Sequence, residues 1–136
     1  MCGHRHLTTK CFVCECCPLT EEGMALLVKA AGQGHAYAMC ALGSIHCEWE
    51  EHQQATAWFT KGAEAGLPNA IHNLAVALDM GKGVAAPDYP AAAGWYRRAA
   101  DAGIGDACVN LGHMYISGRG RAWRMMPASS LYTLVS

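Results

Sequence analysis

The hydrophobic residues in the middle of the chain recur with a period of slightly more than thirty residues. Gly34, Gly66 and Gly103 are 32 and then 37 residues apart, and each is followed four residues later by alanine and eight residues later by leucine. In the second of these stretches the apolar residues Ala70 and Leu74 continue a stripe along one side of a helix. The pattern therefore predicts one amphipathic helix after each glycine, with small residues that let neighbouring helices approach closely.

A second pattern precedes the same glycines. Trp58 lies eight residues before Gly66, Trp95 lies eight residues before Gly103, and each tryptophan is followed by another aromatic ring, a basic residue and alanines. This spacing predicts a helix over residues 91–102 and an equivalent helix before Gly66. We expect both tryptophans to act as wedges in the core, because their repetition matches the packing register.

The ends of these helices are also marked in the sequence. Gly66 and Gly103 suit the left-handed conformation that ends a helix, because glycine has no Cβ to clash there. Asp88 is expected to cap the helix that starts at Tyr89-Pro90, and Thr20 is expected to cap an earlier helix that begins with two glutamates.

Each repeat unit is thus two helices and two turns. Units of this size cannot bury their apolar faces alone, so they stack into an all-α solenoid of antiparallel helix pairs. Residues 20–120 hold a half unit, two full units and a half unit, and the period is lost in the tail over residues 121–136. With so few full units we expect marginal stability, with end-to-end self-association through an uncapped face. Leu111, Met114 and Tyr115 need cover from that tail or stay exposed.

The repeated residues resemble the Sel-one-like repeat (SLR), a relative of the tetratricopeptide repeat. The resemblance implies a right-handed superhelix that serves as a protein-binding adaptor or scaffold through a groove lined by the first helices. The first full unit departs from the pattern, because residues 46–52 stand where Gly-x-Gly-Val is expected. The residues that carry the resemblance are Gly81-Lys82-Gly83-Val84, Asp88-Tyr89, Ala92, Trp95-Tyr96, Arg98-Ala99-Ala100, Gly103, Ala107, Leu111-Gly112 and Tyr115.

Composition narrows the functional classes. The 136 residues are 52% hydrophobic and 15% charged, which fits one small folded domain. A net charge of −1 provides no field for nucleic acid, and no apolar run approaches the roughly 18 residues that span a membrane. Since no secretory signal is visible, we expect a cytoplasmic or nuclear protein whose cysteines are thiols or metal ligands.

The first 19 residues are dense in cysteine and histidine, and two interpretations stay open. One is a thiol-rich tail without fixed structure, because so few aliphatic side chains cannot offset the entropy of ordering. The other is a single zinc ion, whose tetrahedral site uses such ligands. The order of cysteines and histidines also resembles the second half of a RING-type zinc finger, which implies an alternative function as a zinc-binding module in a ubiquitin-related complex. The expected zinc ligands are Cys2, His4, Cys11 and Cys14.

Four polar residues on first helices are candidates for contact with a partner protein or peptide. His72 and His113 lie where related folds line the groove, and Asn73 and Asn110 share a register one residue before a repeated leucine. Each histidine either hydrogen-bonds a partner or is a tolerated helix residue. The asparagines hold a bound peptide backbone or bond a neighbouring helix.

No pattern proposes a reaction, so we expect a protein that is not an enzyme. The polar residues between His46 and His52 make a metal or acid–base site conceivable, with Glu48 and His52 on one helical face, but a solvated turn is the preferred interpretation. Cys40, Cys47 and Cys108 are expected to be small buried apolar groups.

Overall fold

A computed structural model describes residues 21–119, and this span consists of α-helices joined by short turns, with no strand. The proposed zinc ligands Cys2, His4, Cys11 and Cys14, the cap Thr20 and the tail over residues 121–136 lie outside the described residues. The helices are α1 (Glu21–Gly32), α2 (Ala36–Glu48), α3 (His52–Glu64), α4 (Pro68–Met80), α5 (Tyr89–Asp101) and α6 (Gly105–Ser117).

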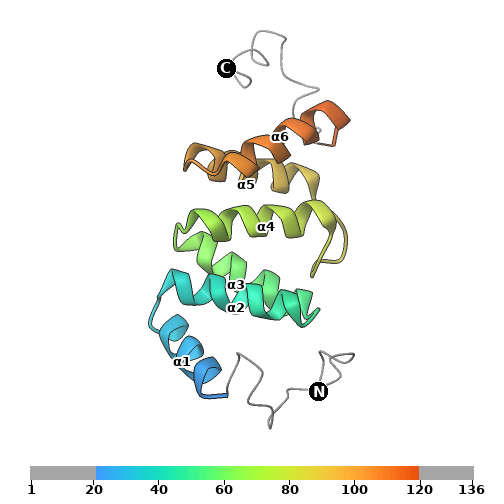
Figure 1. The fold of residues 1–136 in the computed structure, drawn as a ribbon. Helices are drawn as coiled ribbons and strands as arrows, with labels where there is room; N and C mark the ends of the chain where they lie inside the picture. Colours follow the sequence, from blue (N-terminus) through green and yellow to red (C-terminus); the bar gives the residue numbers. More distant parts are fainter. Residues whose placement is uncertain (1–20, 120–136) are drawn as a thin grey trace, which may run out of the picture.

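The helices form one continuous stack, with α1 and α6 at opposite ends (Figure 1). Helices α2, α4 and α6 are the first helices of successive units, and α3 and α5 are the second helices that lie behind them. Each helix packs mainly against its neighbours in the chain, and the most extensive contacts are within the hairpins α2–α3 and α4–α5. The predicted all-α solenoid is therefore confirmed.

The predicted helix ends are also found. Gly66 and Gly103 have φ of +85° and +95°, in the left-handed region that glycine adopts without strain. The Asp88 carboxylate accepts a hydrogen bond of 3.1 Å from the Ala91 amide, so α5 is capped as expected. After the first helices, Gly81 follows α4 and Gly118 follows α6 in the left-handed conformation, whereas after α2 it is Glu50 that adopts it, with φ of +61°.

The aromatic rings at the centre of the core are Phe59 and Tyr96, which are 4% and 1% exposed. Trp58 and Trp95, the predicted core wedges, do pack against the core clusters, but they lie at the edge of the core and are only half-buried. Adjacent helical residues point about 100° apart, so only one ring of each pair faces the core. The outer ring is covered by a cation one turn later, with Lys61 Nζ at 4.4 Å from the Trp58 ring and Arg98 in the same place over the Trp95 ring.

The close approach of the hairpin helices depends on small residues in the first helix. A Cβ added to Gly43 of α2 would lie 2.5 Å from the Phe59 ring of α3, so the absence of a side chain makes room for the ring. The equivalent residue of α4 is Ala75, which is fully buried in the same cluster as Tyr96. In each hairpin, an aromatic ring of the second helix thus packs against a small residue of the first helix.

Helix α6 departs from expectation at the open end of the stack. Leu111 and Met114 are buried in the core cluster that contains Tyr96, so they do not await a cover. The uncovered apolar residues lie on the adjoining side of α6, where Val109 is 57% and Ile116 is 88% exposed. The expectation was therefore wrong for Leu111 and Met114, and cover by the tail over residues 121–136 lies outside the described residues.

Candidate functional site

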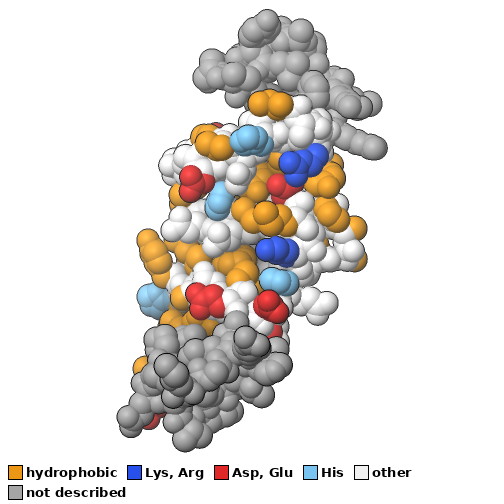
Figure 2. Space-filling view, turned by 45° about the vertical axis from the view of Figure 1, so that its right-hand side comes forward, with side chains coloured by type: hydrophobic (Ala, Val, Ile, Leu, Met, Phe, Trp, Pro, Cys, Tyr) orange, Lys and Arg blue, Asp and Glu red, His pale blue; other side chains and the backbone are white. Residues whose placement is uncertain are grey.

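One side of the first helices forms a surface that we call the groove face. Residues three, four and seven apart on a helix share a side, so each first helix contributes a short stripe. Figure 2 shows hydrophobic side chains on the viewed face, interspersed with histidine, lysine or arginine, and acidic side chains. The groove face consists of Tyr37, Cys40, Ser44 and Cys47 of α2, Asn73, Val76 and Met80 of α4, and Val109, Asn110 and His113 of α6.

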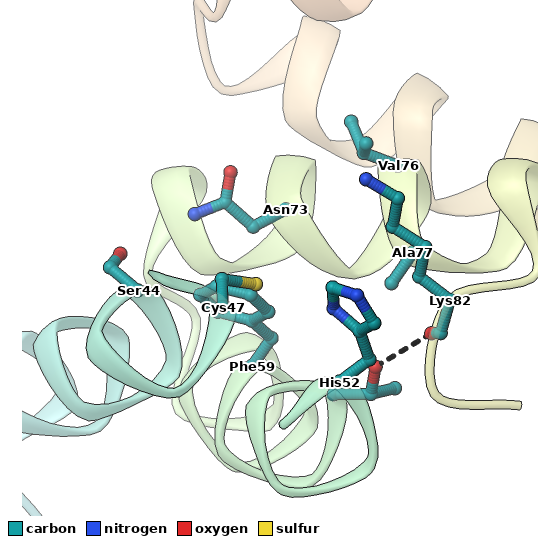
Figure 3. A pocket seen from close by; sticks show the side chains of 9 residues that line it. Ser44, Cys47, His52, Phe59, Asn73, Val76, Ala77 and Lys82 are labelled. Atoms are coloured by element: carbon teal, nitrogen blue, oxygen red, sulfur yellow. Dashed lines mark hydrogen bonds between the residues drawn. The ribbon is translucent and has the colours of Figure 1, made fainter. Parts of the chain in front are cut away.

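A cavity of about 240 Å³ opens where α2, α3 and α4 meet. In Figure 3 the His52 ring, from the start of α3, stands between Cys47 of α2 and the side chain of Lys82, which follows α4. Phe59, Val76 and Ala77 supply apolar walls. The lining residues are Ser44, Cys47, His52, Thr56, Phe59, Asn73, Val76, Ala77 and Lys82.

The turn that carries Lys82 is held against α3 by one hydrogen bond and by a close approach of the two backbones. The Thr56 hydroxyl donates a hydrogen bond of 2.9 Å to the Lys82 carbonyl, which ties the turn after α4 to the side of α3. Gly83 follows with φ of +74°, and a Cβ there would collide with the His52 carbonyl. The close approach of this turn to α3 therefore requires glycine, and it places the Lys82 ammonium at the cavity.

The polar groups around the cavity favour an acidic ligand. Among residues 21–119, Lys82 is the only lysine or arginine in the lining, and no aspartate or glutamate of this span lines the cavity. His52 Nδ1 is buried and has no hydrogen-bond partner within the described structure, so an imidazole nitrogen there is unsatisfied. The amide of Asn73 adds a further donor at the wall.

The thiol in the cavity is not an activated nucleophile. Cys47 is exposed as a residue, but partial burial of its thiol at the cavity raises the pKa of that thiol, and the nearby Lys82 ammonium offsets the rise only in part. At neutral pH the group is therefore a protonated thiol, whereas nucleophilic cysteines are poised as thiolates. The cavity is suited to binding rather than to covalent chemistry.

The predicted contact residues occupy different surroundings. Asn73 lines the cavity and also donates to Cys40 Sγ at 3.9 Å, and Asn110 hydrogen-bonds the Tyr96 phenol. His113 is exposed. His72 is half-buried, with its ring centroid 5.8 Å from that of Tyr96 and its Nδ1 without a partner among the described residues. Both asparagines thus bond neighbouring helices, and partner contact by these four residues stays a prediction.

The polar segment between His46 and His52 contains the expected solvated turn, with Glu48 and Glu50 exposed, but His46 is an exception. His46 is 9% exposed, its Nδ1 lies 2.7 Å from Glu51 Oε2, and its ring meets Trp49 edge-on. Glu48 ends α2 and His52 begins α3, so the expected shared helical face does not exist. No group of three or more His, Cys, Asp or Glu side chains in residues 21–119 forms a metal site.

The expectation for the cysteines of the repeats was also wrong in part. Cys40 is half-buried, but Cys47 and Cys108 are exposed. Cys47 opens onto the cavity and Cys108 faces outward from α6, where the described chain has no further helix.

Comparisons with known proteins agree with this architecture. The Sel1 repeat matches residues 36–67, 68–104 and 105–122, together more than half of the chain. Among solved structures, a protective antigen present in uropathogenic Escherichia coli strains, which displays an SLR fold, is 42% identical with a TM-score of 0.68. The similarity covers 74% of this chain, which spans only 22% of the length of that antigen structure.

A Sel1 repeat protein from Oxalobacter formigenes is 31% identical, with a TM-score of 0.62 over 71% of this chain and 75% of the other. A comparison with curated proteins gave no match. Among the described helices, none combines the length and the apolar character that a membrane crossing requires. The repeated match along the chain and the shared SLR architecture show that this chain belongs to the Sel1 repeat family.

Proposed function

We propose that this protein is a non-catalytic interaction adaptor that binds a peptide segment of another protein along the groove face. In this proposal an acidic side chain of the segment enters the cavity between α2, α3 and α4. Sel1 repeat proteins are generally protein-interaction scaffolds, which supports the general role. The cavity supports the finer statement about the ligand.

The observation that carries the proposal is the combination of cavity size and charge. A volume of about 240 Å³ is below the roughly 300–1,000 Å³ of small-molecule pockets, which favours one side chain over a free metabolite. The Lys82 ammonium provides a charged donor for a carboxylate, and the Asn73 amide at the wall provides a second donor. The aliphatic stem of a glutamate would then lie against Phe59 and Val76.

Exposed apolar residues of the groove face outside the cavity supply further anchors for the segment. Tyr37 of α2 is 75% exposed and Met80 of α4 is 61% exposed. Large apolar side chains around a desolvated polar contact are typical of the centres of protein interfaces. The expected ligand is therefore a peptide with an acidic residue flanked by hydrophobic ones.

A random peptide library displayed on phage tests the proposal with the full chain as bait. We expect enrichment of peptides with a glutamate or aspartate beside apolar residues, and at least a roughly tenfold loss of their affinity in the Lys82→Glu variant. Replacement of the acidic residue by its amide should weaken wild-type binding similarly.

Lys29→Glu is the matched control, because it makes the same charge change on an exposed helical lysine of α1 away from the cavity. Equal losses in the Lys29 and Lys82 variants would reject the cavity as the binding site. Enriched peptides that lack acidic residues would reject the proposed ligand chemistry.

A further inference from the structure

The two ends of the helix stack correspond to the two halves of one hairpin. Helix α1 occupies the place of a second helix, since its Leu26 and Leu27 stand 32 residues before Trp58 and Phe59. Helix α6 begins a third match to the repeat and occupies the place of a first helix. In the span that the structure describes, α1 has no first helix before it and α6 has no second helix after it.

Helix α6 has an open socket where the other first helices receive an aromatic ring. Gly112 is the register equivalent of Gly43, but a Cβ added to Gly112 meets no atom within 4 Å, whereas at Gly43 it meets the Phe59 ring. On the same helix, Ile116 is 88% exposed, although the equivalent Asp79 side chain of α4 is only 14% exposed and pairs with Arg119, which follows α6. Within residues 21–119, α6 therefore lacks the neighbouring unit that covers this side of α4.

Residues of helix α1 are likewise more exposed than their equivalents in the next unit. Leu27 is half-buried, while its equivalent Phe59 is 4% exposed. Leu26 and Val28 are 67% and 50% exposed, although the residue equivalent to Leu26 in the next unit, Trp58, is half-buried. Within residues 21–119, no first helix packs on this apolar ridge of α1 as it would in a complete hairpin.

We infer that α6 of one molecule packs against α1 of a second copy and completes a repeat hairpin between chains. Leu27 of the second copy takes the place of Phe59, and its side chain enters the socket at Gly112. The antiparallel arrangement brings the acidic first turn of α1, Glu21 and Glu22, beside the C-terminal end of α6, where the Arg119 side chain is 45% exposed although it already pairs with Asp79. Shape and register therefore agree on a second copy as the occupant, and the exposed part of Arg119 provides an additional contact for the two glutamates.

This contact joins unlike surfaces and therefore leaves each assembly with a free α6 face and a free α1 face. Such heterologous contacts produce open chains or closed rings rather than a simple two-fold dimer. The groove faces of successive copies would then continue one another along the stack. The inference does not depend on the cavity or on its proposed ligand.

Sedimentation velocity of the full chain in reducing buffer tests the inference, and reduction prevents disulfides through the exposed Cys108. We expect mass to increase with concentration in the wild type. Ile116→Glu and Leu26→Glu should each weaken association by at least about tenfold, because each places a charge in an apolar contact. Both residues are largely exposed in the single chain, so its circular dichroism should stay unchanged.

A mixture of the two variants makes the test specific. The Leu26→Glu chain keeps a normal α6 and the Ile116→Glu chain keeps a normal α1, so the mixture should form a heterodimer that grows no further. Met80→Glu is the control, because it charges an equally exposed apolar residue in the middle of the stack and should leave association intact.

A wild-type chain that is monomeric at every concentration would refute the inference. So would association that neither variant weakens, or a mixture that fails to form the heterodimer. Because the phage-selected peptides report on Lys82 and this assay reports on α1 and α6, the two proposals fail independently.

Discussion

Gly43 and Gly112 occupy the same register position in α2 and α6, and their replacement by alanine should have opposite effects on stability. Both glycines lie inside a helix, where alanine is favoured over glycine by about 1 kcal/mol. Gly112 has open space for a methyl group, so Gly112→Ala should stabilise the protein by about 0.5–1 kcal/mol. We expect no contribution to stability from new contacts, because no atom lies within 4 Å of the added methyl group.

At Gly43 the same methyl group would lie 2.5 Å from one atom of the Phe59 ring and 2.6 Å from another. The ring is 4% exposed and packed among buried residues, so it cannot move aside freely. Overpacking of this kind costs about 1–3 kcal/mol. Because the helix-propensity gain is the same in both variants, the free energies of unfolding of Gly43→Ala and Gly112→Ala should differ by about 1–3 kcal/mol.

Urea denaturation followed by far-ultraviolet circular dichroism measures this difference, at protein concentrations low enough to suppress association. The double variant Gly43→Ala/Phe59→Leu should recover part of the loss, because the smaller side chain relieves the collision. If Gly43→Ala is as stabilising as Gly112→Ala, the ring does not occupy the space above Gly43 and the hairpin packing described for α2 and α3 is wrong.

Three further predictions concern single residues. Glu50→Gly should raise the free energy of unfolding by about 0.5–1 kcal/mol, since Glu50 has φ of +61°, and a rise in urea midpoint would show it. Cys47 should react with iodoacetamide more slowly than an unperturbed thiol near neutral pH, because burial raises its pKa, and Lys82→Ala should slow the reaction further by removing the charge that lowers this pKa. Burial and, to a smaller extent, the charge of Asp79 raise the pKa of Tyr96 from 10.0 to about 12. The neutral phenol therefore contributes roughly 2–3 kcal/mol to the free energy of unfolding below pH 10, and this contribution is lost as the pH rises towards 12. In unfolding measured at several pH values, Tyr96→Phe should remove this loss of stability.

The sequence was sufficient for the helices, their order and the glycine and aspartate residues that limit them, because these depend on local geometry. Gly66, Gly103 and Asp88 have the conformations or bonds expected of them. It was harder to predict from the sequence which ring of each aromatic pair faces the core. Trp58 and Phe59 are adjacent, and repetition alone does not say which ring faces the core; the one-turn spacing to Lys61 was the available signal, because a cation over a ring marks the outer one.

The cavity was mostly beyond sequence reasoning, because its lining comes from separate helices and the turn after α4. Only Asn73 was singled out beforehand as a contact residue. Lys82 was noticed as part of a turn, but its position depends on the Thr56 hydrogen bond and on the close approach of Gly83 to His52. These contacts join residues far apart in the chain and have no signature in periodicity.

Successive units meet at two junctions, α2 with α4 and α4 with α6. A comparison of the two explains why Lys82 lacks the acidic partner that its equivalent has. Asp79 and Arg119 are the register equivalents of Cys47 and Lys82, and they form an ion pair with 3.4 Å between Arg119 Nη1 and Asp79 Oδ1. At the first junction the thiol of Cys47 stands where the second has a carboxylate, so the Lys82 ammonium has no equivalent acidic partner from α2. The repeated residues specify the stack, whereas this departure from the repeat leaves a positive charge available to a ligand. An acidic side chain from another protein would therefore occupy at the first junction the place that the chain's own aspartate occupies at the second.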